Sequence, residues 1–232
     1  MLSTNPVVLI LGAGPNIGKS VACTFAARGY KVALSARSLK DNDTFAGQLQ
    51  IHSDLSDPES VIKVFSKVKE SLGFPSVVVY NAGAATINDA EDPLSLALSD
   101  FTRDLNINTT SAFVAAQEAV LGFRELPESA SKTFIYTGNI LNTTTLPPLL
   151  DLGVGKSAMA HVVQSAAHAY SKNGFKFYYA DERKADGSPV YSAIDGEAHA
   201  EFYLQLAEGK SQKAWQQTFV KDVGYKSFPV SS

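Results

Sequence analysis

Cysteine is nearly absent from this sequence, since Cys23 is the one thiol among 232 residues. A single cysteine forms neither an internal disulfide nor a metal site with several thiolate ligands, which favours a reducing compartment. Cys23 lies among small apolar residues in a stretch with helical spacing, so we expect it in the core. The histidines also lack the spacing of metal ligands, and no metal site is expected.

Long apolar runs are missing as well. The first run, residues 6–11, is far shorter than the ~20 residues that a membrane helix needs. No basic residue precedes it, which argues against a secretory signal, and the carboxyl end carries no recognisable targeting sequence. We therefore expect a cytoplasmic protein that does not bind membranes.

Neither sign of charge dominates, because 20 basic residues face 23 acidic ones for a net charge of −3. This balance argues against broad electrostatic capture of nucleic acid. Hydrophobic residues make up 45% and charged residues 19% of the sequence, as in a globular protein that can bury a sizeable core. The length suggests a single domain spanning residues 1–232.

Short apolar, β-branched runs alternate along the chain with longer stretches of helical spacing. Strands are expected at residues 7–11, 31–35, 49–52, 77–80, 133–137, 175–180 and 218–221. Helices are expected at residues 17–28, 58–72, 95–126, 149–170 and 197–208. This alternation predicts an α/β fold with a doubly wound, mostly parallel sheet covered on both faces. Residues 181–195 are expected to form a long loop, and residues 181–215 a substrate loop with a cap helix.

A glycine-rich turn joins the first expected strand to the first helix. Gly12, Gly14 and Gly18 have the spacing of a dinucleotide-binding turn, with Asn16 and Ile17 between them. The N-terminus of a helix offers free N–H groups and the positive end of a dipole to a phosphate. The plainer interpretation is a tight strand-to-helix turn without a ligand.

The turn also ends in Gly18-Lys19-Ser20, the ending of a nucleoside triphosphate loop, although Ala13 stands where that motif begins with glycine. A triphosphate loop needs an aspartate at the end of a later apolar strand to help bind magnesium. The fourth and fifth expected strands continue into Asn81 and Gly138 instead. We therefore reject the triphosphate interpretation.

Polar residues follow the second and third expected strands. Arg37 and Ser38 come after the second, where an arginine can pair with the 2′-phosphate of NADP(H), whereas a carboxylate would accept a hydrogen bond from the ribose of NAD(H). Asp54 and Leu55 come after the third, where they resemble the pair that flanks the adenine in short-chain dehydrogenases/reductases. The plainer interpretations are a solvated arginine and an aspartate that caps the next helix.

Asn81, Ala82 and Gly83 follow the fourth expected strand, and small residues there permit a close approach of backbone to cofactor. A strand-ending turn is the plainer interpretation. Together with the glycine turn, this order of motifs resembles the short-chain dehydrogenase/reductase superfamily as far as Tyr170. The resemblance implies a single Rossmann-type domain that binds NADP(H), with a homodimer or homotetramer as its assembly.

The resemblance also implies an active site with a Tyr-x-x-x-Lys pair, a preceding serine and an asparagine in the central helix. Lys156 and Asn108 match two of these positions. Leu152 stands where the tyrosine belongs and Asn139 where the serine belongs, while Ala180-Asp181-Glu182 replaces a Pro-Gly. Leucine exchanges no proton, and asparagine donates a hydrogen bond without acid–base chemistry near neutral pH. We expect Asn108, Asn139 and Lys156 to form the remaining site, with Lys156 also binding the cofactor ribose.

Three functions stay open at this point. The first is NADP(H)-dependent reduction of a small organic carbonyl compound with another residue as the acid, for which the candidates are Asp151, Tyr136, Tyr178 and Tyr179. The second is reduction of a centre that needs no proton as it accepts hydride, such as an iminium. The third is an NADP(H)-binding protein without redox turnover, either a regulator or a cofactor-assisted non-redox catalyst. The retained cofactor motifs favour the first two.

Overall fold

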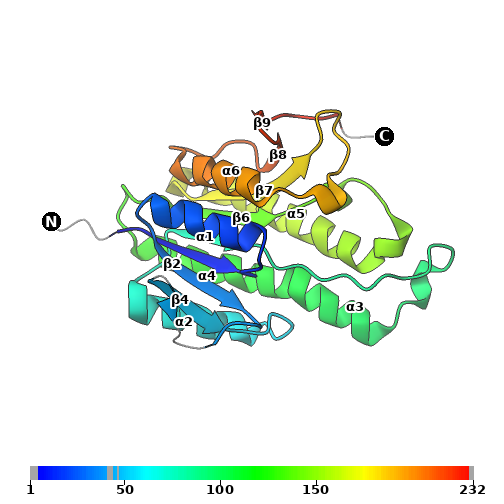
Figure 1. Ribbon diagram of the computed structural model, residues 1–232, viewed down its shortest axis with the longest axis horizontal. Coiled ribbons are helices and arrows are strands. Elements are labelled where there is room, and N and C mark those ends of the chain that lie inside the picture. Colours follow the sequence, from blue (N-terminus) through cyan, green and yellow to red (C-terminus); the bar gives the residue numbers. More distant parts are fainter. Residues whose placement is uncertain (1–4, 41–43, 46, 230–232) are drawn as a thin grey trace.

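The computed structural model describes residues 5–40, 44–45 and 47–229, which form one central sheet with helices on both faces (Figure 1). The strand order is β3-β4-β2-β1-β5-β6-β7-β8-β9. Neighbouring strands are parallel except at the two edges, where β3 pairs with β4 and β8 with β9 in antiparallel fashion. The strands are β1 (Val7–Leu11), β2 (Lys31–Ala36), β3 (Thr44–Phe45), β4 (Gln48–His52), β5 (Val77–Tyr80), β6 (Thr133–Thr137), β7 (Lys176–Arg183), β8 (Gln216–Val220) and β9 (Gly224–Tyr225).

The winding of the sheet reverses between β1 and β5. β1 pairs with β2 on one side and with β5 on the other, so successive crossovers run outward in opposite directions from this point. In doubly wound sheets, ligands bind in the crevice at the carboxyl ends of the strands beside such a switch point. The expected Rossmann-type α/β fold is confirmed.

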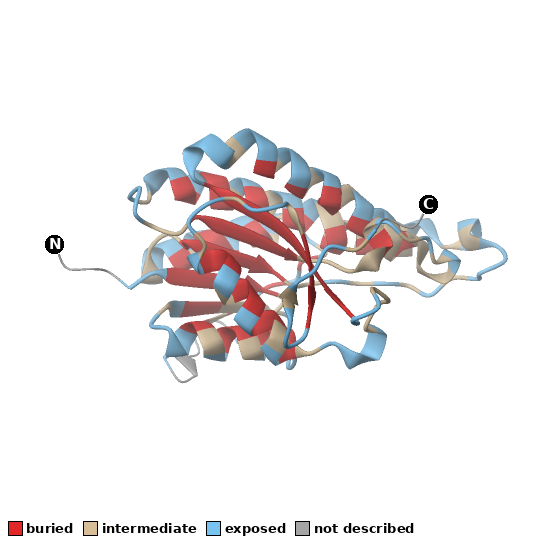
Figure 2. Ribbon diagram, turned by 90° about the horizontal axis from the view of Figure 1, so that it is seen from above, coloured by how far each residue is buried: buried red, intermediate tan, exposed pale blue. Residues whose placement is uncertain are grey.

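Helices cover both faces of the sheet, as Figures 1 and 2 show. They are α1 (Ile17–Ala27), α2 (Glu59–Leu72), α3 (Leu98–Leu105), α4 (Ser111–Glu125), α5 (Leu150–Tyr170) and α6 (Gly196–Glu208). α1 and α6 pack together over one face, while α2, α4 and α5 cover the other. Each layer has its own apolar core, because alternate residues of the strands point to opposite faces. Among the described residues no helix is long and apolar enough to cross a membrane.

The residues of each element account for its position. All five residues of β1 are buried and apolar, as expected of a central strand covered on both faces. α2 buries Val61, Val64, Phe65 and Val68, which form a single stripe at helical spacing. Its remaining residues face solvent, so the helix lies flat on the sheet.

Three tyrosines form a ladder across β5, β6 and β7. The rings of Tyr80 and Tyr136 stack with centroids 5.8 Å apart, and those of Tyr136 and Tyr179 with centroids 5.7 Å apart. Their hydroxyl groups donate to backbone carbonyl oxygens: Tyr80 to Ile107 at 2.5 Å, and Tyr136 to Asn108 at 2.9 Å. The ladder therefore ties the sheet to the helical layer above it.

The prediction of a single helix at residues 95–126 is wrong. The structure has α3 and α4 with a π-helical turn between them at Asn106–Thr110. The hydroxyls of Tyr80 and Tyr136 donate to backbone carbonyl oxygens of this turn. Such turns are frequent at functional sites. The other expected helices and strands match the observed bounds within three residues.

Two further expectations are corrected. β7 continues to Arg183, so residues 181–183 belong to a strand rather than to the expected loop, because β8 pairs beside them. Cys23 is exposed instead of lying in the core. The buried face of α1 is formed by Gly18, Val21 and Phe25 and their neighbours, and position 23 falls on the opposite side of the helix.

Candidate cofactor and substrate site

The glycine turn is shaped by contacts of the backbone. Gly12 has φ +89°, and a Cβ atom there would lie 2.4 Å from the backbone nitrogen of Ala82. A Cβ atom at Gly18 would lie 2.7 Å from the Cα of Ala13. The side chain of Asn81 donates from Nδ2 to the carbonyl oxygen of Gly12 at 2.9 Å. Glycine is thus required at positions 12 and 18, and the turn is locked to the end of β5.

Three backbone N–H groups at the start of α1 lack acceptors. No described residue accepts from the N–H of Asn16, Ile17 or Gly18. Open space adjoins Gly14, since a Cβ atom there would meet nothing within 4 Å. Free N–H groups at the positive end of a helix form a site for phosphate oxygens. The residues present therefore fit the pyrophosphate of a dinucleotide.

The ends of β2 and β4 form the neighbouring part of the crevice. Arg37 and Ser38 are exposed just after β2. A hydrogen bond from the backbone N–H of Ser56 lowers the pKa of Asp54, and the positive charge of Arg37 acts in the same direction. Leu55 is buried, and its carbonyl oxygen accepts from the Ser111 hydroxyl at 2.7 Å. Arg37 and Asp54 therefore lie near one another at this edge, as a shared ligand requires.

Asn108 is fully buried in the π-helical turn. Its Oδ1 accepts from the N–H of Ala84 at 3.0 Å, and its Nδ2 donates to the carbonyl oxygen of Ala84 at 2.7 Å. The amide thus fixes the segment that continues from Gly83. This structural role could not be recognised from the sequence, which offered only the family's active-site asparagine as a reason for a polar residue here.

Lys156 is buried on α5 above the tyrosine ladder. Its Nζ donates to the carbonyl oxygen of Thr137 at 2.8 Å and lies 4.5 Å from the centroid of the Tyr136 ring. Burial lowers the pKa of Lys156 to about 8, although the carboxylate of Asp181 opposes the shift. α5 approaches the π-helical turn closely at Gly155, where a Cβ atom would lie 2.5 Å from the Cβ of Asn108. Lys156 and Asn108 are thereby brought to one end of the crevice.

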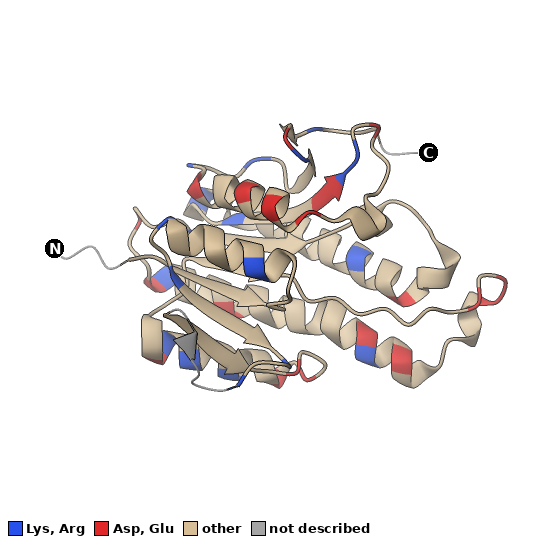
Figure 3. Ribbon diagram, viewed as in Figure 1, with Lys and Arg blue, Asp and Glu red and all other residues tan. Residues whose placement is uncertain are grey.

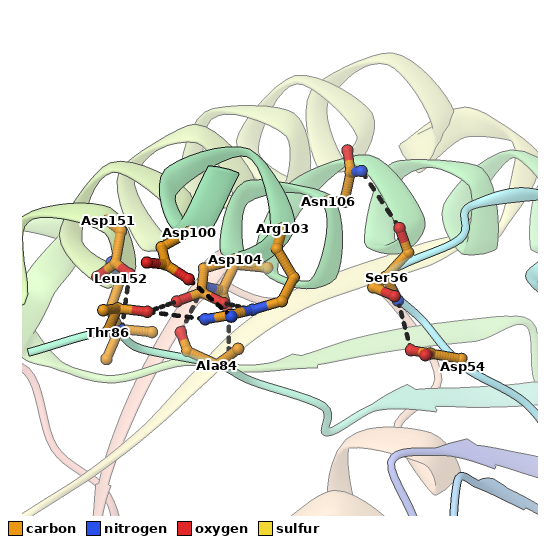
Figure 4. Close-up of polar contacts among 11 residues, drawn as sticks. Asp54, Ser56, Ala84, Thr86, Asp100, Arg103, Asp104, Asn106, Asp151 and Leu152 are labelled. Carbon is orange, nitrogen blue, oxygen red and sulfur yellow. Dashed lines mark hydrogen bonds and ion pairs between the residues drawn. The ribbon is translucent and has the colours of Figure 1, made fainter. Parts of the chain in front are cut away.

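A network of carboxylates holds the segment after β5 (Figure 4). The hydroxyl of Thr86 donates to Asp104 and its backbone N–H donates to Asp151, both at 2.8 Å. Burial and the hydrogen bond with Asp104 raise the pKa of Asp151. Burial acts to raise the pKa of Asp104 as well. Hydrogen bonds with Arg103, Asp151 and Thr86 outweigh this effect and lower the pKa. The two carboxyl groups therefore hold Thr86 between α3 and α5.

A cavity of about 190 Å³ opens at the carboxyl ends of β6 and β7. Both Asn139 and Leu152 line it, so the structure brings together the two positions expected for the family's serine and tyrosine. Oδ1 of Asn139 accepts from the N–H of Leu141 at 3.0 Å, which leaves Nδ2 as the group that can donate to a bound molecule. Much of the remaining wall is aliphatic and is formed by Leu141, Leu146, Leu149, Val190 and Ile194.

The sequence-based candidates for an alternative acid do not line this cavity. The hydroxyls of Tyr136, Tyr178 and Tyr179 donate to the backbone carbonyl oxygens of Asn108, Ser211 and Asn139 respectively. Asp151 is committed to the clamp on Thr86. All four side chains therefore have structural partners, and the partner of Tyr179 is the backbone of Asn139, a residue of the cavity wall.

Four titratable residues in the cavity wall were missed by sequence analysis: Asp181, Glu182, Tyr191 and His199. Burial raises the pKa of Asp181, opposed by its ion pair with Arg183, and burial also raises the pKa of Glu182. Burial lowers the pKa of His199 to about 4. The replacement of Pro-Gly by Ala180-Asp181-Glu182 was the available signal, because charged residues rarely continue a buried strand without a reason.

The fold and the turn define a doubly wound α/β protein shaped to bind a dinucleotide, and comparison with known proteins agrees. A family model described as enoyl-(acyl carrier protein) reductase matches residues 12–179. The short chain dehydrogenase/reductase dmxR12 of a Cryptosporiopsis species is 48% identical over 240 residues, covering 99% of this chain and 97% of that protein. Versicolorin reductase stcU of Emericella nidulans is 29% identical over 130 residues, covering 51% and 47% of the two chains. The chain belongs to the short-chain dehydrogenase/reductase family of oxidoreductases.

Solved structures support the same fold. A short-chain dehydrogenase/reductase from Serratia marcescens matches with a TM-score of 0.75 and 22% identity, covering 93% of this chain and 96% of that one. ElxO with NADP bound matches with a TM-score of 0.77 and 17% identity, covering 94% and 97%. At these identities the likeness establishes the architecture alone. The family binds nicotinamide cofactors. Among the described residues, no group of three His, Cys, Asp or Glu side chains could hold a metal ion.

Proposed function

We propose that the protein is an NADP(H)-dependent oxidoreductase that reduces a small organic carbonyl or imine compound. The observation that carries the proposal is the set of unpartnered N–H groups at the start of α1, placed at the switch point of the sheet. Arg37 at the end of the adjacent strand adds a charge suited to a 2′-phosphate. A dinucleotide bearing that phosphate satisfies both features at once.

The bound nicotinamide supplies the hydride chemistry that no side chain of this protein provides. The N–H groups of Asn16, Ile17 and Gly18 bind the pyrophosphate, and Arg37 with Ser38 binds the 2′-phosphate. Around the rest of the cofactor we assign small or polar residues at the strand ends: Gly12, Gly14, Asp54, Leu55, Asn81, Ala82, Gly83 and Lys156.

At the cavity end, Asn139 donates from Nδ2 to the substrate oxygen. The ammonium of Lys156 holds the ribose and adds positive charge where negative charge develops on that oxygen. Asn108 is a positioning residue, because its amide oxygen accepts from the backbone of Ala84 and its amide nitrogen donates to it. The aliphatic wall around Leu152 favours a substrate whose reacting carbon is attached to apolar groups.

Replacement of Arg37 by alanine tests the cofactor choice. Titration of the protein with NADPH should show roughly a 10–100-fold weaker dissociation constant in Arg37→Ala, the loss of about one charge-assisted hydrogen-bond pair. NADH affinity should change by less than about threefold, because it carries no 2′-phosphate. Arg124→Ala, at the exposed far end of α4, serves as the matched control. Equal loss of NADPH and NADH affinity would contradict the assignment of Arg37.

A second candidate function is that of an NADP(H)-binding protein without redox turnover. Leu152 favours it, because leucine donates no proton. A panel of aldehydes, ketones, quinones and cyclic imines, followed by the absorbance of NADPH, separates the two. Consumption of NADPH with a panel member supports the oxidoreductase, and tight NADPH binding without any consumption supports the alternative.

We also propose a homodimer or homotetramer in the cytoplasm. The groove between α4 and α5 exposes Phe113 and Leu121, which are 44% and 53% exposed. Both side chains lie on α4, and exposed apolar side chains there favour pairing through this face.

A further inference from the structure

The cavity at the ends of β6 and β7 contains a histidine that the proposed function does not use. His199 lies in the first turn of α6 and is 2% exposed, yet it lines the cavity together with Asn139 and Leu152. A titratable ring in a cavity wall can offer a ring nitrogen to a bound molecule.

Hydrogen bonding fixes which nitrogen of His199 carries the hydrogen. Nδ1 lies 2.7 Å from the carbonyl oxygen of Asp195. A carbonyl oxygen only accepts, so Nδ1 carries the hydrogen and donates it. No described residue contacts Nε2 in a hydrogen bond. In the neutral ring Nε2 is therefore a free acceptor, available to a molecule in the cavity.

Packing fixes the orientation of the ring. Phe219 meets the His199 ring edge-to-face at 5.0 Å between centroids, and Tyr203 does so at 5.6 Å. Glu182 closes the remaining side, with Oε2 at 3.4 Å from Nδ1, and the same oxygen accepts from the N–H of Asp195. The imidazole is held from α6, β7 and β8 at once, which is the preorganisation expected of a functional group.

Charged side chains near His199 come from several of the elements packed around it. On β7, Glu182 faces its Nδ1 and Asp181 pairs with Arg183. At the start of α6, Asp195 pairs with Lys221. Lys156 on α5 acts on Asp181 from the far side of the cavity. Since burial lowers the pKa of His199 to about 4, the ring is neutral at pH 7 and Nε2 is an acceptor there.

We propose that Nε2 of His199 binds the hydroxyl group of an apolar substrate in this cavity and takes the role that the family's tyrosine plays at position 152. The aliphatic wall formed by Leu146, Leu149 and Leu152 accommodates the hydrocarbon part. The ligand is thus an apolar alcohol, enol or phenol, rather than a carboxylate or phosphate, which Asp181 and Glu182 would repel.

The inference deepens the proposed function and relies on it for the hydride partner. As an alcohol is oxidised, the O–H bond breaks and its proton moves to Nε2. The electron pair left on oxygen would form the C=O bond, and a nicotinamide bound beside the cavity would accept the hydride from the carbon. The imidazolium that results carries its charge beside Glu182, at 3.4 Å. Reduction is the reverse, and it requires the protonated ring.

The sign of the pH dependence follows from the lowered pKa of His199. Oxidation needs the neutral ring, so its rate is flat above about pH 5 and falls below pH 4. Reduction needs the imidazolium, so its rate falls about tenfold for each pH unit above the pKa of the ring. This profile differs from that of a tyrosine acid, which stays protonated to far higher pH.

The test uses 1-naphthol and naphthalene, which share an apolar skeleton and differ by one hydroxyl. Equilibrium dialysis at pH 7 should show at least about tenfold tighter binding of 1-naphthol to the parent protein, the contribution of one buried hydrogen bond. His199→Phe should lose this preference, whereas the same substitution at exposed His168 should keep it. Equal binding of the two probes by the parent protein overturns the proposal, as does a preference that survives His199→Phe.

A measurement on the parent protein keeps the proposal testable if His199→Phe does not fold. In ¹⁵N spectra, the His199 ring should show hydrogen on Nδ1 at pH 7, and 1-naphthol should shift its Nε2 signal. Hydrogen on Nε2, or no shift at saturating 1-naphthol, overturns the proposal. NADPH titration of the same sample reports separately on the proposed function: bound NADPH without a naphthol preference removes only the role of His199, and the converse removes only the cofactor.

Discussion

The two ends of the crevice differ in the groups that form them, backbone at one end and side chains at the other. At the end beside β1 and β2, the backbone forms the site: Gly12 packs against Ala82, and N–H groups at the start of α1 find no acceptor in the described part of the chain. At the end beside β6 and β7, side chains form it, and Lys156, Glu182 and His199 are each at most 5% exposed. Figure 3 shows the charged residues spread widely over the helices, whereas β7 carries acidic residues at its carboxyl end. Our proposal assigns the cofactor to the first end and the substrate to the second.

The sharpest way to break this comparison is to restore the expected tyrosine and serine together. Leu152→Tyr with Asn139→Ser should raise ketone reduction by about 10²–10⁴-fold, because a phenol four residues before Lys156 supplies the proton. The rate of NADPH consumption with a simple ketone, such as cyclohexanone, measures the gain. Leu152→Phe with Asn139→Ser is the matched control, since it adds the ring without the hydroxyl. No gain over this control would show that the cavity end is not a rebuilt dehydrogenase site.

Replacement of one glycine by alanine at each end compares the effect of an added Cβ atom on the free energy of unfolding. Gly12→Ala should cost roughly 2–4 kcal/mol of unfolding free energy, because a Cβ would meet Ala82 and φ is positive. Gly153→Ala, in α5 at the cavity end, meets nothing within 4 Å and should instead stabilise by up to about 1 kcal/mol. Urea unfolding of both variants measures the difference. Similar effects in the two would contradict a backbone-built cofactor end.

Sequence could predict the first end because its requirements are local. Strand, glycine turn and helix follow one another within residues 7–27, so a motif can be read without knowing the fold. Arg37 and Asn81 could be placed as well, because parallel strands bring their carboxyl ends to one edge. The fold and the order of these elements followed from the same alternation.

The cavity end resisted prediction because its contacts span the chain. Glu182 meets His199 through Asp195, and the hydroxyl of Tyr203 reaches Thr137 from α6. Nothing in the spacing of these residues indicates that they meet. The π-helical turn was also hidden, and the hydroxyl that donates to its Ile107 carbonyl comes from Tyr80 on a distant strand. Departures from the family pattern marked the region but not its chemistry.

The smallest effect we predict separates stability from function at the cavity end. Lys156 has a folded-state pKa of about 8 against an ordinary value of 10.5, so below pH 8 the buried ammonium carries its full cost. Lys156→Met should therefore be more stable than the parent by about 1–3 kcal/mol at pH 7, even though it loses the hydrogen bond to Thr137.

The sign of this effect reverses the usual expectation for a lost hydrogen bond, and its pH dependence identifies the cause. Between pH 8 and 10.5 the unfolded chain binds the proton that the folded one has released, so the parent gains stability as the pH rises. The advantage of Lys156→Met should shrink across this window and be absent above it. Urea unfolding at pH 7 and pH 10.5 measures both values, with exposed Lys172→Met as the control. A constant difference at the two pH values would mean that Lys156 is not an isolated buried charge, and that the cavity end neutralises it with the carboxylate of Asp181.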